Sequence, residues 1–304
     1  MRSYPLVALF VSSLAVSALF VSSLAVSCGG STPRPAQPEP PPPAPAVEPP
    51  VTPPAAQSTP SAGGDNGGEG CPAGMIAIDS GTLWMGSLAG KGRPDERPQH
   101  QVDVRNYCLD KDEVTVGEFK KCVDNEICDP LPRDVQLLKP IKKKKQKELS
   151  RYCTGAMKDN SDLPANCVGH DEAKKYCDWK GLRLPTEIEW EFAATSGDDK
   201  LDYPWGSAKP DDDLLCWKKK DGPCKVGSKK PGAFGADDLE GNLREWTSST
   251  YGPYPQPPDS GDRLVVRGSS WQTTKPDDVR PQRRFAESPL YRNTDLGFRC
   301  AKGR

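Results

Sequence analysis

The chain has 304 residues, a formal net charge of -1 and a mean hydropathy of -0.68. This near-neutral balance excludes the strongly basic composition typical of proteins that bind nucleic acids. The 33 prolines, 28 glycines and 11 cysteines indicate an exported, disulfide-bonded protein rather than a single cytosolic domain.

The N-terminal segment resembles an export signal that ends at a cysteine. Arg2 precedes an apolar, serine-rich run over residues 6–27, in which ALFVSSLAVS occurs twice in succession. The small residues before Cys28 resemble the lipobox of bacterial lipoproteins. We therefore expect a signal peptide over residues 1–27 and a lipid anchor on Cys28, in the bacterial cell envelope facing the periplasm or the exterior. The alternative is an uncleaved membrane anchor, because the run is nearly long enough to span a bilayer.

Residues 28–70 have the composition of a linker. They are rich in Pro, Ala, Glu, Ser and Gly and contain no aromatic residue. Such a segment buries too little apolar surface to offset the entropy lost on ordering. We expect a lipid-anchored, disordered linker, extended where prolines dominate and flexible where glycines do, followed by one folded domain over residues 71–304.

The folded part begins with short strands. CPAGMIAIDSGTLWMGS alternates apolar and polar residues, and the pattern continues through RPQHQVDVRNYCLDKDEVTV. Thr115 and Glu118 have the spacing of a capping box, which predicts a helix over residues 116–124. HDEAKKYCDWKG predicts a second helix that starts near His170 and ends just before Gly181.

A third helix is predicted within LPTEIEWEFAA, where Thr186 and Glu189 again have capping-box spacing. The chain then becomes rich in Gly, Pro and Asp until a final predicted strand, DLGFRCA, over residues 295–301. These elements predict an α+β domain with little regular secondary structure, which needs covalent cross-links for stability.

Nine motifs follow one another in an order that resembles the formylglycine-generating enzyme (sulfatase-modifying factor) family. They are TLWMGS, RPQHQV, DEVTVGEF, AKKYCDWKGLRLPTEIEWEFAA, YPWG, VGS, GNLREWT, VVRGSSW and DLGFRC. The resemblance covers essentially all of residues 71–304. It implies a variant of the C-type-lectin-like fold, a compact α+β domain in which much of the chain is ordered loop.

The resemblance also implies a disulfide between Cys177 and Cys300. If Cys28 carries lipid, ten cysteines remain, and ten cysteines allow many connectivities. The other pairs that we expect are Cys122–Cys128 and Cys216–Cys224, which are close in sequence, and Cys153–Cys167 and Cys71–Cys108, which use the rest. Metal binding is the alternative, but the chain has no C-x-x-C motif and the compartment is oxidising.

The resemblance implies a copper chemistry for which this chain lacks the ligands. Catalytic members oxidise a cysteine of a client sulfatase with molecular oxygen and a copper(I) ion held by two cysteines after a GGSW-type turn. Here those two positions are Thr273 and Asp278, and no cysteine lies between Cys224 and Cys300. Copper(I) prefers soft thiolates, so we expect no copper and no catalytic residue at these positions. Arg244 stands where the family has an active-site tryptophan.

The family resemblance also implies possible iron and calcium sites. Related branches hold iron with histidines, but this chain has only His100 and His170, for which we expect structural roles. The DDLEGNLREW segment resembles a family calcium site made by Asp238, the carbonyls of Gly241 and Leu243, and Glu245. The alternative is a solvated acidic turn. A second family calcium site is expected to be lost, because Leu215 replaces an asparagine.

The segment LKPIKKKKQKELSRYC over residues 138–153 is a basic insertion. We expect a solvated loop, with docking to an anionic polysaccharide or lipid headgroup as the alternative. For the whole chain the favoured hypothesis is a non-catalytic binding or scaffold lipoprotein with a protein or glycan partner in the envelope. The competing hypothesis is a formylglycine-generating type of oxidase with a rebuilt active site, or another oxidative activity.

Overall fold

The computed structural model describes residues 70–304, so Cys28, the predicted signal peptide and nearly all of the predicted linker lie outside the described residues. The first half contains β1 (Met75–Ile78), β2 (Gly81–Met85), β3 (His100–Val104), β4 (Tyr107–Asp110), α1 (Val116–Asp124), α2 (Lys143–Ser150), α3 (His170–Trp179) and α4 (Glu187–Thr195). The second half contains β5 (Arg244–Thr250), β6 (Leu264–Arg267), β7 (Arg284–Glu287), β8 (Leu296–Gly297) and β9 (Ala301–Gly303). No helix among residues 70–304 is long and apolar enough to cross a membrane.

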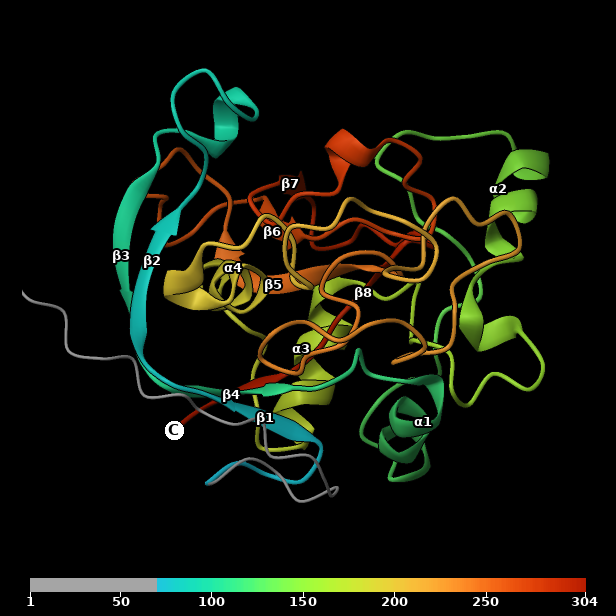
Figure 1. Cartoon of the computed structure of the whole chain (residues 1–304). Helices are drawn as coiled ribbons and strands as arrows, with labels where there is room; N and C mark the ends of the chain where they lie inside the picture. The colour runs from blue at the N-terminus through green and yellow to red at the C-terminus, as the bar shows by residue number, and fades with distance from the viewer. Residues whose placement is uncertain (1–69) are drawn as a thin grey trace, which may run out of the picture. The chain divides into compact units, whose positions relative to one another are not determined.

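The strands form three small sheets (Figure 1). The first has the strand order β1-β4-β9, the second is the β2–β3 hairpin, and the third has the order β7-β6-β5-β8. All pairs are antiparallel except β5 with β8. Helix α4 lies between the hairpin and the third sheet and contacts both, which makes it the centre of the domain.

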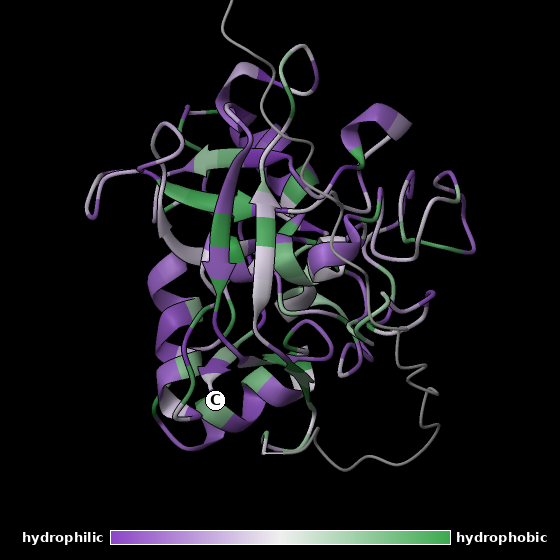
Figure 2. Cartoon of the chain, turned by 60° about the vertical axis from the view of Figure 1, so that its left-hand side comes forward, coloured by the Kyte–Doolittle hydropathy of each residue, from purple (hydrophilic) through white to green (hydrophobic). Residues whose placement is uncertain are grey.

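Buried and more exposed residues alternate along the strands of the hairpin, as in a sheet that has only one face toward the core. Leu83 and Met85 of β2 are buried, whereas Trp84 between them is exposed. Figure 2 shows the same alternation, with hydrophobic residues separated by paler or hydrophilic ones along both strands of the hairpin. The buried side chains pack against α4, where Trp190 is fully excluded from solvent.

The three predicted helices are confirmed, and their first turns show why they start where they do. The Thr115 hydroxyl accepts a hydrogen bond from the Glu118 amide at 3.1 Å. At α4 the Thr186 hydroxyl accepts from the Glu189 amide at 3.2 Å, while the Glu189 carboxylate accepts from the Thr186 amide at 2.8 Å. These side chains satisfy amides that have no partner within the helix.

The predicted final strand over residues 295–301 is wrong as a single element. The segment forms β8, which pairs with β5, and then β9, which pairs with β4 in a different sheet. Between them the Arg299 side chain enters the core and the Phe298 carbonyl accepts from the Val114 amide at 3.0 Å. The chain crosses from one sheet to another here, which local sequence patterns do not encode.

The basic insertion is also not the loop that we expected, because residues 143–150 form helix α2. The helix is held at its inner side, where the Val135 amide donates to the Ser150 hydroxyl at 3.1 Å and Gln146 donates to the Val135 carbonyl at 3.1 Å. Its lysines are exposed on the opposite side, so the charges are solvated as expected.

Five disulfides cross-link the described residues, and they are the five pairs expected from the sequence. They are Cys71–Cys108, Cys122–Cys128, Cys153–Cys167, Cys177–Cys300 and Cys216–Cys224. The Cys177–Cys300 bond closes the longest loop, with a sequence separation of 123, and joins α3 to the crossing segment between β8 and β9.

Candidate functional site

The turn that follows β6 contains Thr273, the first of the two positions at which the family pattern requires a copper ligand. The Ser270 amide donates to the Thr273 hydroxyl at 3.0 Å, and the Thr273 amide donates to the Ser270 carbonyl at 2.9 Å. Trp271 is buried beneath the turn and its indole nitrogen donates to the Thr294 carbonyl at 2.9 Å. The Thr273 side chain therefore closes the turn, and Ser270 and Trp271 hold it in place.

Asp278, the second position, ends a short 3-10 helix at Pro276–Asp278. Its carboxylate forms an ion pair with Arg283 and lies 3.8 Å from the guanidinium of Arg93. Thr273 and Asp278 line one pocket of about 220 Å³, so the structure brings the two positions together. Thr273 supplies a hydroxyl that closes the turn, and Asp278 supplies a hard carboxylate that is already paired with Arg283.

Arg244 occupies the other side of this pocket, which we call the cleft. Its guanidinium donates two hydrogen bonds to Asp295, each 3.1 Å long, and a third of 3.3 Å to Glu287. The Phe285 ring centroid lies 4.7 Å from the guanidinium of Arg244 and 4.8 Å from that of Arg283. The replaced tryptophan position thus places a paired cation in the cleft, where both guanidinium groups lie against an aromatic ring.

A buried charge network, which sequence reasoning missed, joins α4 to the strands β6 and β7. Glu187 and Glu191 lie one turn apart on α4 and face Arg267 of β6 and Arg284 of β7. Arg267 donates to Glu187 at 2.9 Å and Arg284 donates to the same carboxylate at 2.8 Å, while Arg267 also pairs with Glu191. The available signal was the spacing of two glutamates on one helix face together with arginines inside apolar strands.

No residue from 70 to 304 offers a free thiolate, because all ten cysteines in this range are in disulfides. The two histidines pack against different aromatic rings. His170 is the first residue of α3 and meets Trp246 edge-on, and burial lowers its pKa. His100 lies 4.9 Å from Tyr254, measured between ring centroids. The described part of the chain contains no group of three His, Cys, Asp or Glu side chains placed to hold a metal ion.

The predicted calcium ligands differ in their availability. Glu245 is fully buried, and both its oxygens accept hydrogen bonds, from Arg299 at 2.8 to 3.0 Å and from Trp190 at 2.9 Å. Asp238 is 5% exposed; its Oδ2 accepts from the Gly227 amide at 2.8 Å, but its Oδ1 has no partner among the described residues. Burial raises the pKa of Asp238 to about 6.

The turn that carries the other two predicted ligands is anchored by Glu113, which sequence reasoning missed. The Leu243 amide donates to one Glu113 oxygen at 2.9 Å and the Asn242 side chain donates to the other at 2.6 Å. Burial raises the pKa of Glu113, and the negative charge of Asp238 adds to this effect. Of the two predicted carboxylate ligands, only Asp238 has an oxygen available to a hard cation, because Arg299 already neutralises Glu245.

Comparisons with known proteins agree with this architecture. A model of the sulfatase-modifying factor enzyme 1-like domain matches residues 66–304. The inactive C-alpha-formylglycine-generating enzyme 2 of Mus musculus is 30% identical over 267 residues, which cover 75% of this chain and 85% of the mouse protein. Hercynine oxygenase of Mycolicibacterium smegmatis is 31% identical over 239 residues, which cover 68% of this chain and 55% of that protein.

Two solved structures show the same fold at low sequence identity. PvdO from Pseudomonas aeruginosa superposes with a TM-score of 0.60 at 20% identity, and the match covers 76% of this chain and 94% of PvdO. Variable protein 1 of Treponema denticola superposes with a TM-score of 0.58 at 21% identity, covering 76% of this chain and 95% of that protein. At such identities the likeness concerns the fold alone.

Proposed function

The chain belongs to the sulfatase-modifying factor enzyme 1-like family, and on that premise we propose that it is a non-catalytic binding module of a bacterial cell envelope. The observation that carries the proposal is the state of the two degenerate positions. Thr273 uses its hydroxyl to close a turn and Asp278 uses its carboxylate to pair with Arg283. A copper(I) ion in the cleft would have neither thiolate, and a hydroxyl and a carboxylate are poor ligands for a soft ion.

The family name alone does not decide between catalysis and binding. One relative is named as an inactive formylglycine-generating enzyme and another as an oxygenase, at nearly equal identity to this chain. The proposal therefore depends on the residues of the cleft. Every cysteine from 70 to 304 is oxidised, so a replacement thiolate site would require the opening of a disulfide.

The chemistry of the cleft supports a polar partner. Arg244 and Arg283 place N–H donors next to the Phe285 ring, and acidic side chains balance both guanidinium groups. A balanced cleft of this kind favours hydrogen-bonded recognition of a protein segment or a glycan over capture of an isolated ion. Lipidation of Cys28 would present the domain at the membrane surface, where such partners are found.

Copper(I) affinity tests the proposal directly. The purified full chain is titrated under anaerobic conditions with copper(I) held by a coloured chelator, beside a Cys28→Ser control that removes the cysteine outside the described disulfides. Neither protein is expected to withdraw copper from the chelator. Stoichiometric withdrawal by the Cys28→Ser protein, with its disulfides intact, would contradict the proposal, because it would require other ligands in the domain.

A further inference from the structure

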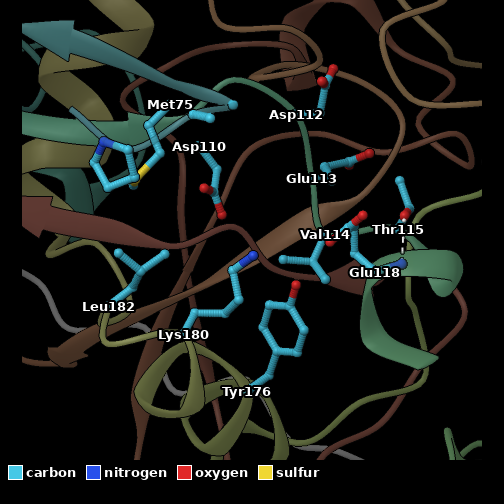
Figure 3. A pocket seen from close by; sticks show the side chains of 13 residues that line it. Met75, Asp110, Asp112, Glu113, Val114, Thr115, Glu118, Tyr176, Lys180 and Leu182 are labelled. Carbon is cyan, nitrogen blue, oxygen red and sulfur yellow. Dashed lines mark hydrogen bonds between the residues drawn. The ribbon is translucent and has the colours of Figure 1, made fainter. Parts of the chain in front are cut away.

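A second pocket, of about 440 Å³, lies between β1, β4 and the helices α1 and α3 and shares no lining residue with the cleft (Figure 3). Its walls come from residues 72–75, from residues 110–118 and from the end of α3 with the turn that follows. The volume is in the range that small-molecule sites use. We call it the α3 pocket.

The most informative group in the α3 pocket is the hydroxyl of Tyr176. The Tyr176 residue is 3% exposed, but its hydroxyl oxygen is open to the pocket and forms no side-chain hydrogen bond with any residue from 70 to 304. Figure 3 shows this hydroxyl directed into the pocket. The buried hydroxyl of Tyr107, by contrast, donates to the Glu189 carbonyl at 2.6 Å. The Tyr176 hydroxyl is free to bond with a molecule that enters the pocket.

Opposite charges face each other across the same space. Lys180 follows the last residue of α3, four positions after Tyr176; its side chain is exposed and makes no ion pair within the described chain. Asp110 enters from the end of β4 on the other wall, and its Oδ2 accepts from the Cys300 amide at 2.8 Å. In Figure 3 the Lys180 amine and the Asp110 carboxylate both point toward the middle of the pocket, whereas Asp112 and Glu113 turn away.

Two disulfides fix these groups relative to one another. Cys177, next to Tyr176, is bonded to Cys300, whose amide holds Asp110, so one cross-link positions both charged walls. Cys71–Cys108 joins the segment before β1, which forms a third wall, to β4. A site whose polar groups are held before binding loses less entropy when a ligand enters.

We propose that the α3 pocket binds a small aliphatic zwitterion, of the α-amino acid class. The ligand carboxylate would accept hydrogen bonds from the Lys180 amine and the Tyr176 hydroxyl, while its ammonium group would donate to Asp110. The apolar side chains of Met75, Val114 and Leu182 also line the pocket, beside Asp112, Glu113 and Glu118, and suit an aliphatic part. This inference does not depend on the function of the cleft, because the two pockets share no residue.

Three matched probes test the chemistry: L-leucine, 3-methylbutylamine, which lacks the carboxylate, and 4-methylpentanoate, which lacks the ammonium group. Each is titrated calorimetrically into the full chain in detergent. L-leucine is expected to bind about tenfold more tightly than either half-molecule, because each lost charge-assisted contact weakens binding by about that factor. Failure of L-leucine to bind, or equal binding of all three probes, would overturn the proposal.

Variants assign the contacts. Tyr176→Phe and Lys180→Gln are each expected to weaken L-leucine and 4-methylpentanoate about tenfold and to leave the amine unchanged, because they remove partners of the carboxylate only. Lys175→Gln, on the same helix but outside the pocket, is the matched control and should bind every probe like the parent. Tyr176→Phe removes a hydroxyl without an internal partner, so the variant is expected to keep the parent melting temperature. L-leucine binding that is unchanged in both variants would contradict the assignment.

Discussion

Glu245 and Arg299 form an ion pair from which solvent is fully excluded, with both side chains 0% exposed and 2.8 Å between Nη2 of Arg299 and Oε1 of Glu245. Arg299 also donates to the carbonyls of Asp110, Lys111 and Asp237, at 2.7 to 3.1 Å. Arg299, a residue of the GFRC motif, thus joins β5 to the end of β4 and to the loop that contains Asp237. This ion pair gives the GNLREWT and GFRC motifs a structural role that is independent of catalysis.

Removal of one partner of this ion pair should therefore strongly reduce the stability of the domain. Glu245→Gln leaves the Arg299 charge buried without its counter-ion, and we expect the free energy of unfolding to fall by about 3–5 kcal/mol. Denaturant unfolding of the full chain measures this. Asp124→Asn, which breaks the exposed Lys120–Asp124 pair, is the matched control and should cost less than about 1 kcal/mol. Equal effects of the two variants would contradict the structural role.

The disulfides should differ in what they contribute, because the loops they close differ in length. In the chain-entropy model, replacement of both Cys177 and Cys300 by alanine costs about 5 kcal/mol, whereas the same change at Cys122 and Cys128 costs about 2 kcal/mol. The sequence separations are 123 and 6. Non-reducing peptide mapping should recover both pairs from the parent protein. A free thiol at Cys177 or Cys300 in the native protein would refute this account.

Asp238 should make stability depend on pH in a defined direction. Its pKa is raised from 3.8 to about 6 by burial. Between these values the folded state binds more protons than the unfolded state, so the stability that protonation supplies is complete below the ordinary pKa and is lost as the pH rises through about 6. A calcium ion at the unpaired Oδ1 would replace the proton above that pH.

We therefore expect millimolar calcium to raise the melting temperature at pH 7.5 and to have no effect at pH 4.5, because only the ionised carboxylate binds the ion. Asp238→Ala should abolish the rise. Glu245→Gln should lower the melting temperature but keep the calcium-dependent increment, because Glu245 is paired with Arg299. If chelator and calcium give the same melting curve at pH 7.5, calcium has no role at this turn.

Lipidation of Cys28 can be read from the mature N-terminus. Mass spectrometry of the membrane fraction is expected to find a diacylated N-terminal peptide that begins at Cys28, because the small residues before it resemble a lipobox. Cys28→Ser should leave the chain without this modification. Recovery of an intact Met1 start in the parent protein would show that the apolar run is an uncleaved anchor instead.

The sequence predicts those features that neighbouring residues determine. The starts of α1 and α4 follow from threonine and glutamate three positions apart, because the threonine caps both helices and the glutamate completes the capping box of α4. The crossing of the chain between β8 and β9 could not be predicted in this way, because it depends on where Arg299 meets Glu245, 54 positions earlier. Helix α2 was missed for a similar reason, since its inner side is held by Val135.

For the site residues, too, the sequence predicts positions but not the partners that they meet in the fold. Motif order located Thr273 and Asp278, and the structure places both in the cleft. It could not show that Asp278 pairs with Arg283 or that Glu245 is neutralised, because a residue's type does not reveal its partner. Tyr176 reads as an ordinary core residue of an amphipathic helix; only the absence of a hydrogen-bond partner within the described chain distinguishes it.

Peptide oxidation tests whether the cleft is a binding site without catalytic activity. The purified full chain is incubated with copper(I), oxygen, a reductant and a cysteine-bearing sulfatase peptide, and aldehyde is counted by mass spectrometry after hydrazine capture. Because Thr273 and Asp278 cannot supply the soft ligands that copper(I) needs, the account predicts no aldehyde above a control without protein. Repeated turnover, with more than one aldehyde formed per protein molecule, would contradict it.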